Sequence, residues 1–303
     1  MEAQLFYPRK SRLTRVFAII TANKLLLVGS LIVLLVVCTA IFVSIDDVVY
    51  EGALIERILH SPYQMNARER LSPPSASHPL GTDQLGRDVL ARIIYGSRVS
   101  IQVGLLAVGL SGAIGTVIGV LAGYIGGKFD DFVMRIVDIL LAFPGLILAI
   151  AIAGFLGPSL TNVIIALSAK AWVSYARVMR ANVLKMKDVE YIQAAKALGS
   201  SEARIIFKNI LPNVATPMII LATMELGSII ISEAGLSFLG LGPQPPMASW
   251  GNMLNLGRAH ITTAWWLSAF PGLAIFLTVM GFNLLGDALA DAFDPKITLP
   301  TRR

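Results

Sequence analysis

The sequence is poor in the side chains from which most active sites are built. It contains one cysteine, Cys38, and three histidines, His60, His78 and His260, among 303 residues. A single cysteine excludes an intrachain disulfide, and the histidines share no recognisable metal-ligand spacing. The patterns H-E-x-x-H and G-x-S-x-G are both absent. We therefore expect no catalytic residue and no metal site, which leaves a membrane-embedded enzyme as a weak alternative.

A phosphate-binding loop is missing as well. The nearest approach to G-x-x-x-x-G-K-[ST] is Gly126-Gly127-Lys128-Phe129, which lacks both the upstream glycine and the hydroxyl. We expect no cofactor in this chain, so that ATP and magnesium, where they are needed, are bound by another subunit.

Charge is the third scarcity, and it defines the class of protein. Charged residues make up 15% of the chain against 55% hydrophobic residues, and the mean hydropathy is +0.70. A bilayer core about 30 Å thick needs about 20 helical residues per crossing, and the predominantly apolar runs supply six such stretches. The sequence therefore predicts an all-α membrane protein with six transmembrane helices, near residues 25–45, 99–123, 134–155, 160–179, 213–232 and 266–286.

The distribution of lysine and arginine predicts the orientation of these spans. Most of the 25 basic residues fall in the segments that are internal if the N-terminus is internal. Both termini are thus expected in the cytoplasm, and the net charge of +6 reports topology rather than nucleic-acid binding. The first apolar run is too long for a cleavable signal peptide and is expected to remain as an anchor. The expected organisation is a cytoplasmic segment 1–24, a first transmembrane helix 25–45, an external loop 46–98, a five-helix core 99–290 containing cytoplasmic helices at 188–209, and a cytoplasmic tail 291–303.

Glycine marks two places where the chain must pack closely. Gly115, Gly119 and Gly123 recur at four-residue spacing and place a flat strip on one face of the second span, where another helix can approach. The segment 233–264 is long, apolar and glycine-rich. Backbone this irregular cannot face lipid, so it is expected to pack on protein or to line an aqueous cavity at the outer surface.

A basic, polar island between the fourth and fifth spans is the most patterned part of the chain. Its first half, 188–198, predicts a helix, and Gly199 can end that helix in the left-handed conformation. Ser200 or Ser201 can cap a second helix, which Pro212 is expected to stop before the fifth span. Two short helices joined at an angle would form a rigid lever.

The island resembles the EAA coupling motif of ABC importer permeases, Glu-Ala-Ala-x3-Gly-x9-Ile-x-Leu-Pro. The matching residues are Gln193, Ala194, Ala195, Gly199, Leu211 and Pro212, with Gln193 in place of the glutamate and Asn209 in place of the isoleucine. Further segments are similar to the second permease subunit of dipeptide, oligopeptide and nickel importers, and the likeness covers residues 78–297. These segments are His78–Asp88 with Tyr95–Arg98, Ser237–Gly242, Phe282–Asp287 and Asp294–Lys296.

The resemblance implies a type I importer fold in a bacterial or archaeal cytoplasmic membrane. It also implies four partners: a homologous second permease, two ABC ATPase subunits that contact the island, and an external substrate-binding protein. Peptides are the expected substrate, with nickel, a metal chelate or glutathione as alternatives. An ATP-independent secondary carrier is a more distant alternative, and such carriers usually contain inverted repeats.

Charged residues inside the spans are candidates for the transport pathway because they are costly in lipid. Glu225 lies in the middle of the fifth span and Glu233 at its outer end, near a possible gate. Lys170 lies in the fourth span, where it can pair with an acid or face the pathway. Arg135 and Asp138, near the inner end of the third span, are expected to pair with each other.

Overall fold

The computed structural model describes residues 24–50, 55–56 and 59–293. Over these ranges every regular element is a helix, apart from one isolated bridge between Thr82 and Asp88. The expected cytoplasmic segments 1–24 and 291–303 lie almost wholly outside the described residues. The major helices are α2 (Lys24–Val49), α4 (Val89–Ile125), α5 (Gly127–Ala142), α6 (Gly145–Leu156), α7 (Leu160–Lys187), α8 (Glu190–Ala197), α10 (Leu211–Phe238), α11 (Trp250–Gly257) and α12 (Trp266–Phe293). Single turns complete the set at η1 (Ala67–Glu69), α9 (Glu202–Arg204), η2 (Ile205–Ile210) and η3 (Arg258–His260).

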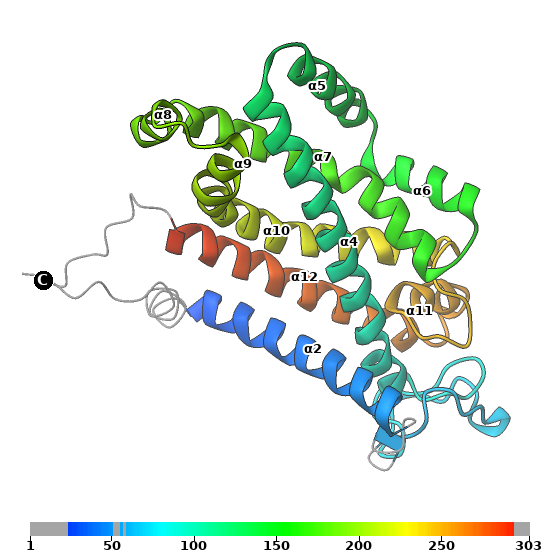
Figure 1. Ribbon diagram of the computed structural model, residues 1–303. Coiled ribbons are helices and arrows are strands. Elements are labelled where there is room, and N and C mark those ends of the chain that lie inside the picture. The colour runs from blue at the N-terminus through cyan, green and yellow to red at the C-terminus, as the bar shows by residue number, and fades with distance from the viewer. Residues whose placement is uncertain (1–23, 51–54, 57–58, 294–303) are drawn as a thin grey trace, which may run out of the picture.

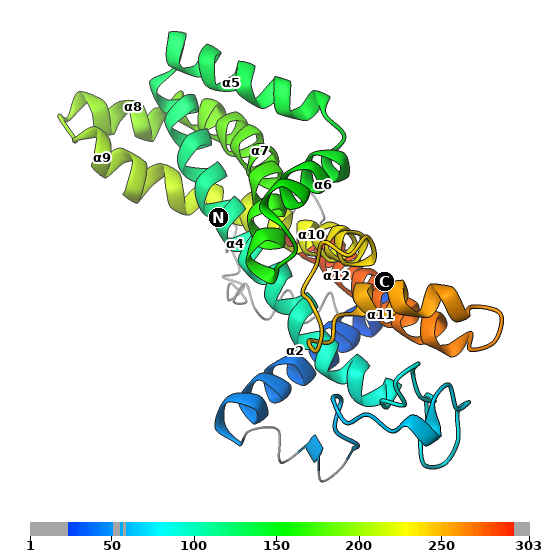
Figure 2. The same ribbon diagram turned by 90° about the vertical axis from the view of Figure 1, so that its right-hand side faces the viewer.

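The helices form one bundle with distinct ends. α2, α12 and α10 lie side by side, and α4 crosses them along much of its length (Figure 1). Seen from the side, α8 and α9 project from one end of the bundle, whereas α11 and the segment before α4 lie at the other (Figure 2). The island is therefore separated from the expected external loops by the length of the apolar helices.

The expected count of six spans is not confirmed. Four of the described helical stretches are long and apolar enough to cross a membrane: α2, α4, α12 and the continuous stretch Glu202–Phe238 that contains α10. A bent pair, α5 with α6, brings the number to five if it counts as one span. α7 has the length of a span, at 28 residues, but it carries Lys170, Arg177 and Arg180 and is not among the apolar stretches.

The third span, predicted as one helix over 134–155, is broken. α5 and α6 meet at an angle of 91° across Phe143 and Pro144. Proline has no N–H for the helix ladder and pushes the residue before it into an extended conformation. Phe143 is indeed extended, with φ −85° and ψ 134°. The length and apolar composition of the run predict one continuous span, because a single proline changes neither of them.

α5 is fastened to α7 by two ion pairs. Arg180 contacts Asp130 through both Nε and an Nη atom, at 2.5 and 2.6 Å. Asp138 lies 3.6 Å from Arg177, so its partner is on α7 and not the expected Arg135 on its own helix. The nearer bidentate pair is the stronger of the two contacts, because the exposed pair is screened by solvent.

The glycine strip on α4 packs against α7, as predicted. A Cβ atom added at Gly115 or Gly119 would overlap a backbone carbonyl oxygen of α7, that of Trp172 or Ala176. A Cβ at Gly123 would lie 2.9 Å from the carbonyl oxygen of Arg180. The two backbones thus approach each other over two turns with no side chain between them, and this makes α4 and α7 the most closely associated helices of the bundle.

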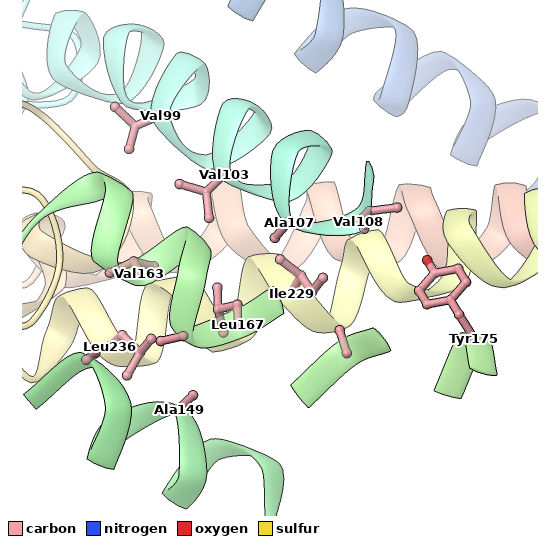
Figure 3. Close-up of a cluster of buried hydrophobic side chains, with 13 residues drawn as sticks. Val99, Val103, Ala107, Val108, Ala149, Val163, Leu167, Tyr175, Ile229 and Leu236 are labelled. Carbon is pink, nitrogen blue, oxygen red and sulfur yellow. The ribbon is translucent and has the colours of Figure 1, made fainter. Parts of the chain in front are cut away.

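The main apolar core lies where α4, α6, α7 and α10 meet (Figure 3). Val103 and Ala107 of α4 face Leu167 of α7 and Ile229 of α10, and Ala149 closes the cluster from α6. Each of these side chains is buried. Small and β-branched residues dominate, which lets the helices approach closely in a lipid environment that gives no hydrophobic drive for association.

The glycine-rich segment between α10 and α12 packs on protein, as its composition predicted. α11 lies against α10 and α12, and the indole Nε1 of Trp250 donates a hydrogen bond to the carbonyl of Ile93 at 2.9 Å. Gly251 lies against the carbonyl of Ala234 so closely that a Cβ would overlap it. The irregular backbone is therefore held against the α4 and α10 helices.

Candidate functional site

The island at the end of the bundle has the predicted sharp corner. α8 ends in two hydrogen bonds that pair Ser200 N–H with the carbonyl of Ala195 (3.0 Å) and Gly199 N–H with that of Lys196 (2.9 Å). This arrangement is the Schellman motif, which requires a left-handed residue, and Gly199 supplies it with φ +75°. Ser201 then caps the next helix, with its hydroxyl accepting from Arg204 N–H at 3.4 Å.

Pro212 does not stop the second helix, contrary to the prediction. The helix runs without a break from Glu202 to Phe238. A π-helical stretch, η2, precedes the proline, and Leu211 N–H bonds to the carbonyl of Ile206, five residues back. A π turn shifts the hydrogen-bond ladder by one residue. Pro212, which has no N–H to offer, then falls in the first turn of α10, where the missing donor is tolerated.

A small apolar core anchors the island to the bundle. Ile192 of α8 and Ile205 and Ile210 of η2 are fully or almost fully buried against Met179 and Val183 of α7. Ala195 and Leu211, both part of the motif, pack against the edge of this cluster while staying half-exposed. The corner is thus held by α7 and α10 as a rigid projection.

The other motif residues face outward. Gln193, Ala194, Gly199 and Pro212 are exposed, and Gln193 uses its amide to donate to the carbonyl of Lys187 at 3.1 Å. Large apolar side chains lie exposed among them: Leu198 is 87% and Phe207 68% exposed, and Val189 and Tyr191 are also exposed. An exposed apolar surface at a rigid corner is typical of a protein–protein contact.

A polar cavity of about 240 Å³ lies in the middle of the bundle, between α6, α7 and α10. Lys170 and Glu225 both line it, and the Lys170 side chain lies against Gly145, where an added Cβ would be 2.8 Å from Nζ. The Glu225 carboxyl lies close enough to Lys170 to interact with it electrostatically, and it accepts a hydrogen bond from the hydroxyl of Ser174. Two of the three candidate pathway residues are therefore brought together, and Ser228 and Ser232 continue the polar wall.

Glu233, the third candidate, occupies a different environment. It is fully buried, and it accepts hydrogen bonds from Ser237 at 2.6 Å and from Ser100 of α4 at 3.2 Å. It does not line the cavity that holds Glu225. Its position favours a structural contact between α10 and α4 over direct exposure to a transported molecule.

The comparisons with known proteins agree with this architecture. Residues 115–299 match the family model described as the binding-protein-dependent transport system inner membrane component. The match spans more than half of the chain, and it includes the island and the Lys170–Glu225 cavity. The chain belongs to this family, the membrane-spanning permeases of ABC importers with the type I fold.

Three relatives illustrate the range of the family. The chain is 45% identical over 276 residues to the dipeptide transport system permease protein of Alkalihalophilus pseudofirmus, covering 91% of this chain and 87% of the relative. It is 44% identical to the probable D,D-dipeptide transport system permease protein of Escherichia coli, covering 78% and 80% of the two chains. It is 46% identical to the glutathione transport system permease protein of Pectobacterium atrosepticum, covering 74% of each chain.

Proposed function

We propose that this permease imports dipeptides or oligopeptides, using ATP hydrolysed by separate ABC ATPase subunits that bind the exposed surface around α8 and Gly199. The observation that carries the proposal is the combination of this exposed apolar corner with a polar cavity, part of whose wall lies on the helix Glu202–Phe238 that follows the corner. A homologous second permease would complete the pathway, and an external binding protein would deliver the substrate. The dipeptide relatives support the substrate class.

Glutathione is the second candidate substrate, and a specific observation favours it. Glutathione is itself a small peptide, and the glutathione permease relative is about as similar as the two dipeptide relatives. The Lys170–Glu225 cavity carries one positive and one negative side chain, which suits the carboxylate and ammonium groups that both molecules carry.

Reconstitution tests the proposed function. We expect the purified chain alone in liposomes to neither hydrolyse ATP nor take up peptide. ATP-dependent uptake of a radiolabelled dipeptide should appear only when the second permease, the ATPase subunits and the binding protein are added. Uptake driven by a proton or sodium gradient in the isolated chain would contradict the proposal, and competition with unlabelled glutathione separates the two substrates.

Glu225 provides a residue-level test of the pathway. Glu225→Gln removes the ionisable carboxyl group that lies beside Lys170 in the cavity. In the reconstituted complex we expect peptide uptake to fall at least tenfold, the equivalent of about 1.4 kcal/mol, with unchanged assembly. Glu225→Asp, which keeps the charge, should retain most uptake. Equal activity of Glu225→Gln and wild type would exclude a role for this charge.

A further inference from the structure

The segment before α4 brings together side chains that no part of the transport mechanism uses. His60, His78 and Asp88 each place one potential ligand atom within 4.8 Å of the other two. His60 and Asp88 are 28 residues apart in the chain, and His78 and Asp88 are both buried. We propose that these three residues form a binding site for a divalent transition metal of the zinc type at the outer end of the bundle.

Both ring nitrogens of His78 face a carboxylate oxygen, which is a favourable environment for a cation. Its Nδ1 lies 2.8 Å from Asp88 Oδ2, and its Nε2 lies 3.4 Å from Glu69 Oε2. A neutral imidazole carries a proton on only one nitrogen and would turn the lone pair of the other toward a carboxylate oxygen, whereas an imidazolium would donate to both carboxylates. A metal bound between Nδ1 and Asp88 removes this conflict, because Nε2–H then donates to Glu69.

The three side chains also make contacts outside the proposed metal position, and these contacts resemble those found around the ligands of metal sites. Ligating histidines usually donate their other ring N–H to a carboxylate or a backbone carbonyl. Glu69 takes this place beside His78, and the carbonyl of Ser77 lies 3.1 Å from His60 Nε2. Asp88 is fixed as well, since its Oδ1 caps α4 by accepting from Ala91 N–H at 2.8 Å. Each ligand is thus oriented by a contact outside the metal position.

The donor set selects the kind of ion. Two imidazole nitrogens and one carboxylate oxygen suit zinc, whereas calcium and magnesium prefer oxygen ligands alone. Ligand atoms around a tetrahedral zinc lie about 3.3 Å apart, given bonds of about 2.0 Å. His78 and Asp88 are already near this spacing, and the exposed His60 has to move inward by at most about 1.5 Å.

A fourth position is open toward solvent. A surface cavity of about 320 Å³ adjoins the cluster and is lined by Glu56, His60, Ser77 and Asp88 among others. The cavity gives the ion a route of entry and leaves room for a water, or for the Glu56 carboxylate, as the fourth ligand. A bound ion would tie the chain just after α2 to the cap of α4.

Zinc titration of the whole chain tests the site. The protein, purified through a tag without histidine, stripped with a chelator and placed in lipid nanodiscs, should bind one Zn²⁺ in isothermal titration calorimetry. His60→Asn and His78→Asn should each weaken binding at least tenfold. His260→Asn changes the remaining histidine, which lies in η3 outside the cluster, and should leave the affinity unchanged.

Two outcomes would overturn the proposal: no saturable Zn²⁺ binding, or an equal loss in the His260→Asn variant. His60→Asn guards against a folding artefact, because His60 is exposed and its removal leaves the Asp88 cap intact.

Cobalt gives an independent readout. The visible absorption of bound Co²⁺ should report a tetrahedral site in the wild type, and the spectrum should change in His60→Asn; an unchanged spectrum would contradict ligation by His60.

Discussion

Gly119→Ala is expected to destabilise the bundle strongly, although it adds a single methyl group. The new Cβ would overlap the carbonyl oxygen of Ala176 and approach Met179, so the backbones of α4 and α7 would have to separate. A backbone carbonyl cannot rotate away as a side chain can. We expect a loss in the free energy of unfolding at or above the upper end of the roughly 1–3 kcal/mol that overpacking costs, and a sharp drop in recovery of monodisperse protein.

Gly109→Ala is the matched control, because Gly109 lies on the same helix with nothing within 4 Å of an added Cβ. Alanine favours helix over glycine by roughly 0.5–1 kcal/mol, so this variant should be neutral or slightly more stable. Thermal unfolding of both variants in detergent, followed by size-exclusion chromatography after heating, compares them directly. Equal melting temperatures would show that α4 and α7 do not need their close approach.

Gly199→Val is expected to uncouple ATP hydrolysis from transport while leaving the bundle folded. The left-handed φ of +75° costs a residue with a side chain about 1–2 kcal/mol. That penalty shifts the population of the correct corner by roughly 5- to 30-fold. The corner is exposed and remote from the main core, so its misalignment should reduce substrate-stimulated ATPase activity and uptake and spare membrane insertion.

Gly199→Asn separates backbone conformation from bulk. A Cβ at this position meets nothing within 4 Å, so space does not limit substitution. Asparagine adopts the left-handed conformation more readily than other residues with side chains, and it should therefore retain most coupling. If both variants lost coupling to a similar degree, the backbone conformation of the corner would not be the decisive property. The decisive property would then be that glycine has no side chain, which lets a partner approach closely.

The features that the sequence predicted are those set by local pattern. The four-residue spacing of Gly115, Gly119 and Gly123 defines one helix face whatever the surroundings, and the closeness of α7 follows. The corner at Gly199 depends on six consecutive residues, Ala195 to Ser200, and on the preference of glycine for positive φ. Long uncharged runs located α2, α4, α10 and α12 for the same reason, since span length depends only on bilayer thickness.

The predictions that were wrong concern residues whose effect depends on the neighbouring backbone. Pro144 bends the chain by 91°, whereas Pro212 leaves a continuous helix because the π turn before it shifts the hydrogen bonds. Proline alone does not distinguish the two cases. The association of His60, His78 and Asp88 was missed because it forms only when the segment folds back onto the start of α4. Their irregular spacing in the sequence gives no metal-ligand signal.

The continuous helix from Glu202 to Phe238 connects the island to the cavity and to the opposite end of the bundle. At about 1.5 Å per residue its 37 residues extend about 55 Å. If this helix moves as one body, a tilt at the island displaces Glu225 and the α11 contact together. The wall of the cavity and the outer surface would then change together, because one movement of the same helix would shift both. The π turn and Pro217, which has no N–H for the helix ladder, are two places in this stretch where the helix can bend.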